Sequence, residues 1–195
     1  MGTPIQLTDR TLAKARRLLL HAARVLDKHQ VRYHLEGGTL LGIVRDGDLL
    51  PWDHDLDISI PFSDLERFKA CLPEFSSRHW IVRTRLGFHC GHPAMGSSQN
   101  RLFKVKDRVG LFFSGRMCLD IFVKHEHEGF VYWEAKEKLM RVESRFYRSY
   151  EEVEYQGVKL KVPNDYRDYL SAKYGDWSVP VKEWDCALHE HTIVA

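Results

Sequence analysis

The sequence predicts an α+β protein that folds as one domain over residues 1–195. Helical and strand-like segments follow one another irregularly along the chain, rather than in repeated strand–helix units. Hydrophobic residues make up 44% of the chain, which is enough to bury a core without disulfides. The length suits one domain, and no internal repeat interrupts it.

The helices are predicted from apolar spacing and from their end signals. A stripe at alternating steps of three and four predicts a long first helix over about Thr8–Lys28. Three further helices are expected: a short one starting at Gly37-Gly38, one from the capping box Ser63–Glu66 to about Cys71, and one from the N-cap Asn164 to Tyr174, closed by Gly175 in a left-handed conformation.

Strands are predicted where apolar and polar residues alternate. The expected strands are Val31–Leu35, His54–Ile60, Trp80–Val82, Arg101–Lys106, Val109–Ser114, Met117–Val123, Phe130–Trp133 and Val158–Val162. The segment Gly87–Gln99 is rich in Gly, His and Ser and is expected to be a loop. The tail from Pro180 onward has no clear pattern.

Charge and composition exclude several classes of protein. The net charge is +2, with 29 basic and 27 acidic residues, which argues against a nucleic-acid binder that acts by charge alone. The four cysteines form no CxxC pair, so we expect reduced thiols and a cytoplasmic protein. No apolar stretch is long enough for a transmembrane segment, and peripheral association with the inner face of the membrane is left open.

Three aspartates at alternate positions are the strongest chemical signal. Asp53, Asp55 and Asp57 fall on one face of the predicted strand His54–Ile60. Neighbouring carboxylates repel one another unless a cation lies among them, and hard oxygen ligands suit Mg²⁺ or Mn²⁺. The alternative is an edge strand whose charges prevent aggregation.

Two further features support the metal hypothesis. Gly37-Gly38 lies between a strand and a helix, where backbone amides can hold phosphate oxygens. Asp120 lies in the apolar run Cys118–Phe122, where a lone carboxylate is costly to bury without a partner. Asp120 therefore either completes the metal site or pairs with a nearby Arg or Lys.

Other candidates for donor binding have ordinary structural alternatives. The Thr39 hydroxyl, Arg45 and Lys104 are candidates to contact donor phosphates. Arg45 could equally form a surface ion pair with Asp46 or Asp48. Trp52 could stack on a base or a choline head, or simply pack the start of the strand.

A zinc site is a weaker alternative for the histidine-rich loop. It would use His89, Cys90 and His92 with a distant ligand such as Cys71 or His125, but the spacing matches no standard zinc pattern.

The chain resembles the LicD family, which includes bacterial phosphocholine transferases and is related to the fukutin-related proteins. The resemblance starts with Glu36–Gly42, Arg45 and Pro51–Asp57, and continues in Asp120–Phe122. It ends with Val162–Tyr166, Tyr169-Leu170 and Tyr174–Trp177, so the motif-bearing part runs from about 31 to 177.

This resemblance implies a nucleotidyltransferase-like fold, with a mixed β-sheet flanked by helices. It implies that Asp55, Asp57 and Asp120 are the catalytic, metal-binding carboxylates, with Asp53 as support or as a ligand of a second metal. Asp120 is also a candidate to take the proton of the acceptor hydroxyl. The implied reaction moves a phospho-alcohol, most often phosphocholine from CDP-choline, onto a sugar hydroxyl of a cell-surface glycan or glycolipid, with release of CMP.

Rival functions remain at this stage. A nucleotidyltransferase would attack the α-phosphate and release pyrophosphate instead. CDP-ribitol or CDP-glycerol could replace CDP-choline. A binding module that has lost catalysis is disfavoured because all the candidate carboxylates are present.

Overall fold

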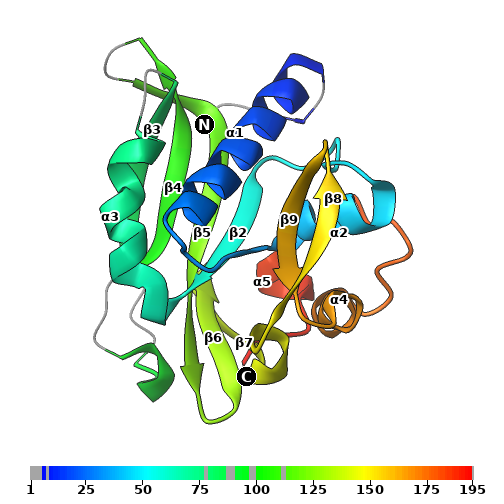
Figure 1. Cartoon of the computed structure of the whole chain (residues 1–195). Coiled ribbons are helices and arrows are strands. Elements are labelled where there is room, and N and C mark those ends of the chain that lie inside the picture. Colours follow the sequence, from blue (N-terminus) through cyan, green and yellow to red (C-terminus); the bar gives the residue numbers. More distant parts are fainter. Residues whose placement is uncertain are drawn as a thin grey trace.

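The computed structural model describes residues 6–7, 9–76, 79–86, 91–96, 100–110 and 113–194 (Figure 1). Its helices are α1 (Asp9–Lys28), α2 (Gly37–Asp46), α3 (Leu65–Phe75), α4 (Tyr166–Tyr174) and α5 (Cys186–His189), with short 3₁₀ turns at Phe62–Asp64, Pro93–Met95 and Ser144–Tyr147. Its strands are β1 (His34–Leu35), β2 (Leu56–Pro61), β3 (Trp80–Leu86), β4 (Asn100–Val109), β5 (Phe113–His127), β6 (Phe130–Ala135), β7 (Lys138–Glu143), β8 (Tyr150–Tyr155) and β9 (Val158–Pro163).

A mixed sheet with the order β1-β2-β5-β4-β3 forms the centre of the fold. β2 and β5 are parallel, whereas β1, β4 and β3 run antiparallel to their neighbours. β6 pairs with the far end of β5 and then with β7, and β8 and β9 form a separate hairpin. The prediction of a mixed sheet flanked by helices is confirmed.

The two faces of this sheet differ in chemistry. One face is apolar and packs under α1 and α3, which lie on the same side of β3, β4 and β5 in Figure 1. Side chains such as Ile58, Val105 and Ile121 join Leu19 of α1 and Phe68 of α3 in one hydrophobic cluster. The opposite face carries the polar residues of β2 and β5, because successive side chains of a strand point to opposite faces.

Several predicted boundaries were wrong. The predicted strand Val109–Ser114 includes the end of β4, a turn at Gly110 and the start of β5 instead of one strand. The predicted strand Met117–Val123 lies within β5, which is longer at both ends. The strands β7 and β8 were not predicted. In β8, the charged residues hide the alternation of apolar and polar side chains. Within the predicted loop Gly87–Gln99, residues 87–90 and 97–99 lie outside the described residues, and Pro93–Met95 forms a 3₁₀ turn.

The capping box at Ser63–Glu66 does not form. Asp64 is the N-cap of α3, but its carboxylate makes no capping hydrogen bond. It accepts hydrogen bonds from the backbone and the guanidinium of Arg32 at 2.8–3.0 Å. A bidentate ion pair satisfies this carboxylate better than helix amides do.

The last predicted helix starts one residue later than expected. Asp165, not Asn164, occupies the N-cap position of α4, with a positive φ of 50°. The backbone amide of Asn164 instead donates a hydrogen bond to the carbonyl of Phe146. Gly175 ends α4 at φ 69° and ψ −122°, so its φ is positive as predicted, but its ψ lies outside the left-handed helical region.

Candidate active site

Three carboxylates meet at the centre of the polar face of the sheet. Asp57 of β2 pairs directly with Asp120 of the parallel strand β5. Asp55 lies two residues before Asp57, directly before β2 begins at Leu56. One carboxylate oxygen from each of the three lies within 4.8 Å of the others. The triad inferred from the sequence therefore comes together, although Asp120 is 63 positions from Asp57 in the chain.

The carboxylates of the triad lie in a poorly solvated part of the protein. Burial, with the charges of Asp120 and Asp53, raises the pKa of Asp55 to about 7. Burial and the charges of Asp55 and Asp120 raise the pKa of Asp57 well above its ordinary value. Three desolvated carboxylates this close repel one another, and a divalent cation among them would remove that cost. The donor set and its spacing fit a hard metal ion such as Mg²⁺ or Mn²⁺.

Asp120 has two protein partners as well. Its Oδ2 forms an ion pair with Lys104 of the neighbouring strand β4, and its Oδ1 accepts a hydrogen bond from the Cys118 thiol at 2.9 Å. Burial opposes the charge of Lys104, but Asp120 outweighs it and raises the Lys104 pKa. The ion pair that was the alternative for Asp120 is thus present together with the carboxylate cluster. Both contacts hold the Asp120 carboxylate in a fixed position beside the other two aspartates.

The Gly37-Gly38 turn faces two of the aspartates at close range. Gly37 has a φ of +55°, which favours glycine, and a Cβ there would lie 2.5 Å from Asp57 Oδ2. A Cβ on Gly38 would lie 2.0 Å from Asp53 Oδ2. Any larger residue would displace these carboxylates. The glycine pair therefore allows the N-terminus of α2 to approach the acidic strand.

Asp53 supports this turn, at the side of the triad. Its carboxylate accepts a hydrogen bond from the His54 amide at 2.8 Å, and burial raises its pKa. It is not one of the three carboxylates that converge within 4.8 Å. This placement agrees with a supporting role, while the second-metal role stays a prediction.

A cavity of about 620 Å³ opens over the triad. Its walls combine the aspartates and the glycine turn with apolar side chains from α2, β5, β6 and the C-terminal segment. Four tryptophans line it: Trp52, Trp133, Trp177 and Trp184. Its basic lining residues are Arg45, Lys104, Lys136, Lys173 and Lys182. Its volume falls in the ordinary range of small-molecule and cofactor sites.

Two predicted donor contacts lie in the cavity wall with protein partners. Arg45 forms the ion pair with Asp46 that was its alternative, at 2.8 Å, and also donates to the carbonyl of Trp177 at 3.3 Å. Trp52 has the Lys182 ammonium 5.6 Å from its ring centroid. A ligand that stacked on this face of Trp52 would share it with a lysine.

Two other predicted contacts turn inward. Thr39 is 1% exposed and does not line the cavity; its hydroxyl accepts a hydrogen bond from the Asp57 amide at 2.9 Å. The Gly37 amide donates to Glu36 Oε1 at 3.2 Å. Thr39 thus holds the triad strand against α2, whereas the Gly37 amide is taken up by the N-cap of its own helix. Of the groups expected to bind phosphate in this turn, the Gly38 amide at the start of the helix is the better candidate.

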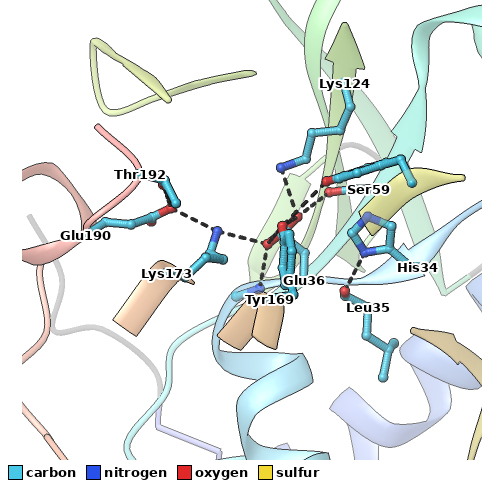
Figure 2. A network of polar contacts seen from close by, with 11 residues as sticks. His34, Leu35, Glu36, Ser59, Lys124, Tyr169, Lys173, Glu190 and Thr192 are labelled. Carbon is cyan, nitrogen blue, oxygen red and sulfur yellow. Dashed lines mark hydrogen bonds and ion pairs between the residues drawn. The ribbon is translucent and has the colours of Figure 1, made fainter. Parts of the chain in front are cut away.

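Beneath the turn lies a buried network centred on Glu36, which was not predicted as a site residue (Figure 2). Glu36 is 2% exposed and caps α2. Its carboxylate lies 2.8 Å from the Lys124 ammonium and 2.9 Å from that of Lys173. It also accepts hydrogen bonds from the hydroxyls of Tyr169 and Ser59 at 2.8 and 2.7 Å.

The charges in this network compensate one another. Burial alone would raise the pKa of Glu36, but Lys124 and Lys173 lower it well below its ordinary value. Lys173 also pairs with Glu190 at 2.9 Å, and Lys124 lies 3.3 Å from the ring centroid of Trp133. Two lysines and two glutamates thus form a buried, nearly neutral cluster that joins β5, α4 and the C-terminal segment to the active-site turn.

Sequence signals for this network were present but indirect. Glu36 directly precedes the glycine pair, and Lys124 falls on the same strand face as Asp120 at i+4. Lys173 lies between Tyr169 and Tyr174 of the C-terminal motif. None of these spacings indicates a buried ion pair, because each partner lies on a different element.

The zinc alternative is not supported among the described residues. His89 and Cys90 lie outside them. The described candidate ligands Cys71 and His125 have other environments: the Cys71 thiol donates to the Phe68 carbonyl, and His125 stacks on Phe62. In the described part of the chain, only the three aspartates cluster closely enough to hold a metal. The described helices also include none long and apolar enough to cross a membrane.

Comparison with known proteins gives relatives that match this site region. The chain is 27% identical over 179 residues to the ribitol-5-phosphate transferase FKTN of Homo sapiens, covering 88% of this chain and 34% of FKTN. It is 29% identical over 58 residues to the lipopolysaccharide cholinephosphotransferase LicD of Haemophilus influenzae, covering 30% of this chain and 22% of LicD. This chain thus spans about a third or less of these relatives.

A solved structure with a similar arrangement is the antibiotic-resistance factor ANT(2'')-Ia. The two share a TM-score of 0.46 at 15% identity, covering 87% of this chain and 78% of the other.

The profile of one family covers most of the chain. The family described as "LicD/FKTN/FKRP, nucleotidyltransferase domain" matches residues 30–165, which contain the glycine turn and all three clustered aspartates. The chain belongs to the LicD/FKTN/FKRP nucleotidyltransferase-domain family.

Proposed function

We propose that this protein is a metal-dependent transferase that moves a phospho-alcohol from a CDP-linked donor to a sugar hydroxyl of a glycan or glycolipid, releasing CMP. The observation that carries the proposal is the meeting of Asp55, Asp57 and Asp120 opposite the N-terminus of α2, in a cavity large enough for a nucleotide. The named relatives support it, since they transfer ribitol phosphate or phosphocholine.

Each part of the site has a role in this proposal. Asp55, Asp57 and Asp120 would hold Mg²⁺ or Mn²⁺, which neutralises charge on the donor diphosphate when bound. The Gly38 amide would bind a phosphate oxygen, and Lys104 beside Asp120 would add positive charge near the transferred phosphoryl group. Little covalent work falls on the protein, so positioning the two substrates is its main task.

The alcohol is the finer part of the proposal. The resemblance in the sequence favoured phosphocholine. Two aromatic faces that could hold a quaternary ammonium already have lysines over them, Lys182 at Trp52 and Lys124 at Trp133. A neutral polyol such as ribitol or glycerol would avoid repulsion from these lysines. CDP-ribitol and CDP-glycerol therefore stand beside CDP-choline as donors to test.

A second candidate function is nucleotidyl transfer, in which an NMP group moves to the acceptor and pyrophosphate leaves. The family's nucleotidyltransferase domain favours this alternative at the level of the fold. The two reactions differ in the phosphorus attacked, so their products separate them.

Product analysis tests the proposal. The protein is incubated with CDP-choline, CDP-ribitol, CDP-glycerol or CTP, with Mg²⁺ and a mixture of cell-surface glycans, and nucleotide products are separated by chromatography. We expect CMP from at least one CDP-alcohol, and none when EDTA replaces Mg²⁺. Pyrophosphate from CTP without CMP from any CDP-alcohol would favour the nucleotidyl alternative. CMP release that persists in EDTA would contradict the metal role.

A further inference from the structure

One wall of the cavity comes from the C-terminal part of the chain, beyond the residues 30–165 that the family profile matches. This part consists of α4 and of the C-terminal segment, residues 175–194, which carries α5. Two of its cavity-lining residues are charged and buried: Lys173 in the last turn of α4 and Glu190 directly after α5. Their charges are therefore fixed in the cavity wall.

A continuous chain of contacts leads from Glu190 to the glycine turn (Figure 2). The Lys173 ammonium lies between two carboxylates, 2.9 Å from Glu190 and 2.9 Å from Oε1 of Glu36. The same Oε1 accepts the hydrogen bond from the Gly37 amide at 3.2 Å. The position of this oxygen therefore depends on how Lys173 is shared between the two glutamates.

The backbone of Glu36 is held independently of its side chain. Its amide donates to the Asp57 carbonyl at 3.0 Å, next to the paired strands β1 and β2. Rotation of the Glu36 side chain would release the Gly37 amide without moving the strand that carries Asp57. The effect would fall on the glycine turn, where the Gly38 amide is the candidate to bind a donor phosphate, rather than on the metal-binding carboxylates.

Glu190 is itself oriented by the C-terminal segment. The Thr192 hydroxyl donates a hydrogen bond to its Oε1. The His191 amide donates to the Lys173 carbonyl at 3.0 Å, and the Thr192 carbonyl accepts from the Arg141 amide of β7 at 2.8 Å. These contacts present the Glu190 carboxylate to the Lys173 ammonium in one orientation.

Attachment of the C-terminal segment does not require this buried charge. The backbone contacts to β7 and the packing of Ile193 on the core already fasten it. Burial opposes the charge of Lys173, but Glu190 and Glu36 outweigh it and raise the Lys173 pKa. A buried ion pair contributes little stability compared with apolar residues of the same size, but it does fix one geometry. The geometry of the glycine turn is what this array can fix.

We propose that Glu190 is a positioning residue for the donor: through Lys173 and Glu36 it holds the glycine turn in the conformation that binds a donor phosphate. This inference rests on the proposed function for the identity of the ligand, and it adds a part of the chain outside the matched profile to the site. Without the Glu190 charge, Lys173 would draw the Glu36 carboxylate toward itself and away from the Gly37 amide.

Binding measurements test the inference without catalysis. The variant E190Q keeps the size of the side chain and removes its charge. CDP is titrated into the whole protein by calorimetry in saturating Mg²⁺, with inorganic pyrophosphate as a second probe. Mn²⁺ binding without nucleotide is followed separately by electron paramagnetic resonance. The matched control E154Q removes an exposed glutamate of β8, a strand that contributes none of the described cavity-lining residues.

We expect E190Q to bind CDP at least about fivefold more weakly than the wild type, a loss typical of one helix-capping hydrogen bond. Its Mn²⁺ affinity should change by less than about twofold, because the strand that carries Asp57 stays in place. E154Q should match the wild type in both measurements. Unchanged CDP affinity in E190Q would overturn the inference. Equal losses of CDP and Mn²⁺ affinity would also overturn it, since a general structural defect would then explain both.

A double-mutant cycle tests the route through Lys173. In K173M, Glu190 has lost the ammonium through which it acts, so K173M/E190Q should bind CDP no more weakly than K173M. A further loss in the double variant would show that Glu190 acts directly and would overturn the positioning role.

The variant T192V takes the place of E190Q if circular dichroism shows that E190Q does not fold. It removes the hydroxyl that orients Glu190 and leaves the charges intact. We expect CDP affinity to fall by at least about twofold with Mn²⁺ affinity unchanged. CDP affinity equal to that of the wild type would overturn the inference.

Turnover separates this inference from the proposed function. A wild type that binds CDP but releases no CMP from any CDP-alcohol would defeat the proposed function, while the titration of E190Q still decides the positioning role. A wild type that binds neither CDP nor pyrophosphate would overturn the inference, because the glycine turn would then hold no phosphate. Where transfer occurs, E190Q should raise KM for the donor by at least about fivefold and leave kcat within about twofold.

Discussion

Asp57 and Asp120 are direct partners across the parallel pair β2 and β5, and one carboxylate oxygen of each lies within 4.8 Å of one of Asp55. Side chains on directly paired positions lie about 5 Å apart, so the backbone itself fixes the spacing of the two ligands. The site is therefore built into two central strands of the sheet, and its electrostatic cost is part of the fold.

The substitution Asp57→Asn should stabilise the metal-free protein. The amide keeps the shape of the carboxyl group but removes the need to protonate a buried acid whose pKa is raised well above its ordinary value. We expect the free energy of unfolding in EDTA to rise by about 1–3 kcal/mol, as measured by urea denaturation at pH 8. Asp168→Asn, at a side chain that is 68% exposed, is the matched control and should change stability little. A destabilised D57N protein would contradict the repulsion argument.

The substitution Gly38→Ala should impair donor binding through Asp53. The new Cβ would lie 2.0 Å from Asp53 Oδ2, so either the helix or the carboxylate must move. We expect KM for the CDP-alcohol to rise by about tenfold or more, since small misplacements of a binding group are costly. Asp53→Ser provides the room, so the double variant G38A/D53S should be no worse than D53S alone. Strictly additive losses in this double-mutant cycle would show that the two residues do not interact.

The substitution Glu36→Gln should destabilise the protein strongly. It leaves Lys124 and Lys173 buried with their main counter-charge removed. We expect a loss of about 3–5 kcal/mol in the free energy of unfolding, measured by urea denaturation. Glu74→Gln removes an exposed ion pair with Lys28 and is expected to cost at most about 1 kcal/mol. Similar losses in the two variants would mean that the buried network adds nothing beyond a surface pair.

His34 should make the protein sensitive to mild acid. It is fully buried beside Glu36, Lys124 and Lys173, and burial lowers its pKa to about 4. The folded state resists protonation, so its stability is complete above the unfolded pKa near 6.5 and falls as the pH drops toward 4. This one residue should account for about 3 kcal/mol over that range.

The variant His34→Gln isolates this contribution. Its free energy of unfolding, measured by urea denaturation from pH 7 to pH 4, should fall less steeply than that of the wild type. Some slope should remain, because burial also lowers the pKa of His125 to about 4. Parallel curves for variant and wild type would show that His34 is not protonated on unfolding.

The sequence predicted the catalytic carboxylates of the site better than the residues that hold them in place. The spacing of Asp55 and Asp57 predicts that both side chains lie on one face, because alternation along an extended segment is a local property. Asp120 could be inferred only through its apolar surroundings and the family resemblance, since strand pairing is not local. The Glu36 network was missed because its members come from β5, α4 and the C-terminal segment, which only the tertiary fold brings together.

Local signals also failed where a tertiary contact was stronger. The capping box at Ser63–Glu66 gave way to the ion pair between Asp64 and Arg32. The Thr39 hydroxyl was expected at the donor phosphate, but it accepts a hydrogen bond from the Asp57 amide instead. In both cases a buried polar side chain has its partner in a distant segment, which a reading of neighbouring residues cannot detect.

Direct measurement of metal binding tests the central claim that Asp55, Asp57 and Asp120 hold the ion on which transfer depends. Mn²⁺ is titrated into the protein with a saturating CDP-alcohol, and free Mn²⁺ is followed by electron paramagnetic resonance. We predict binding by the wild type and by D168N, and affinity at least about tenfold weaker for D55N, D57N and D120N, because each loses a charged ligand. Unchanged Mn²⁺ affinity in D57N and D120N would contradict the account.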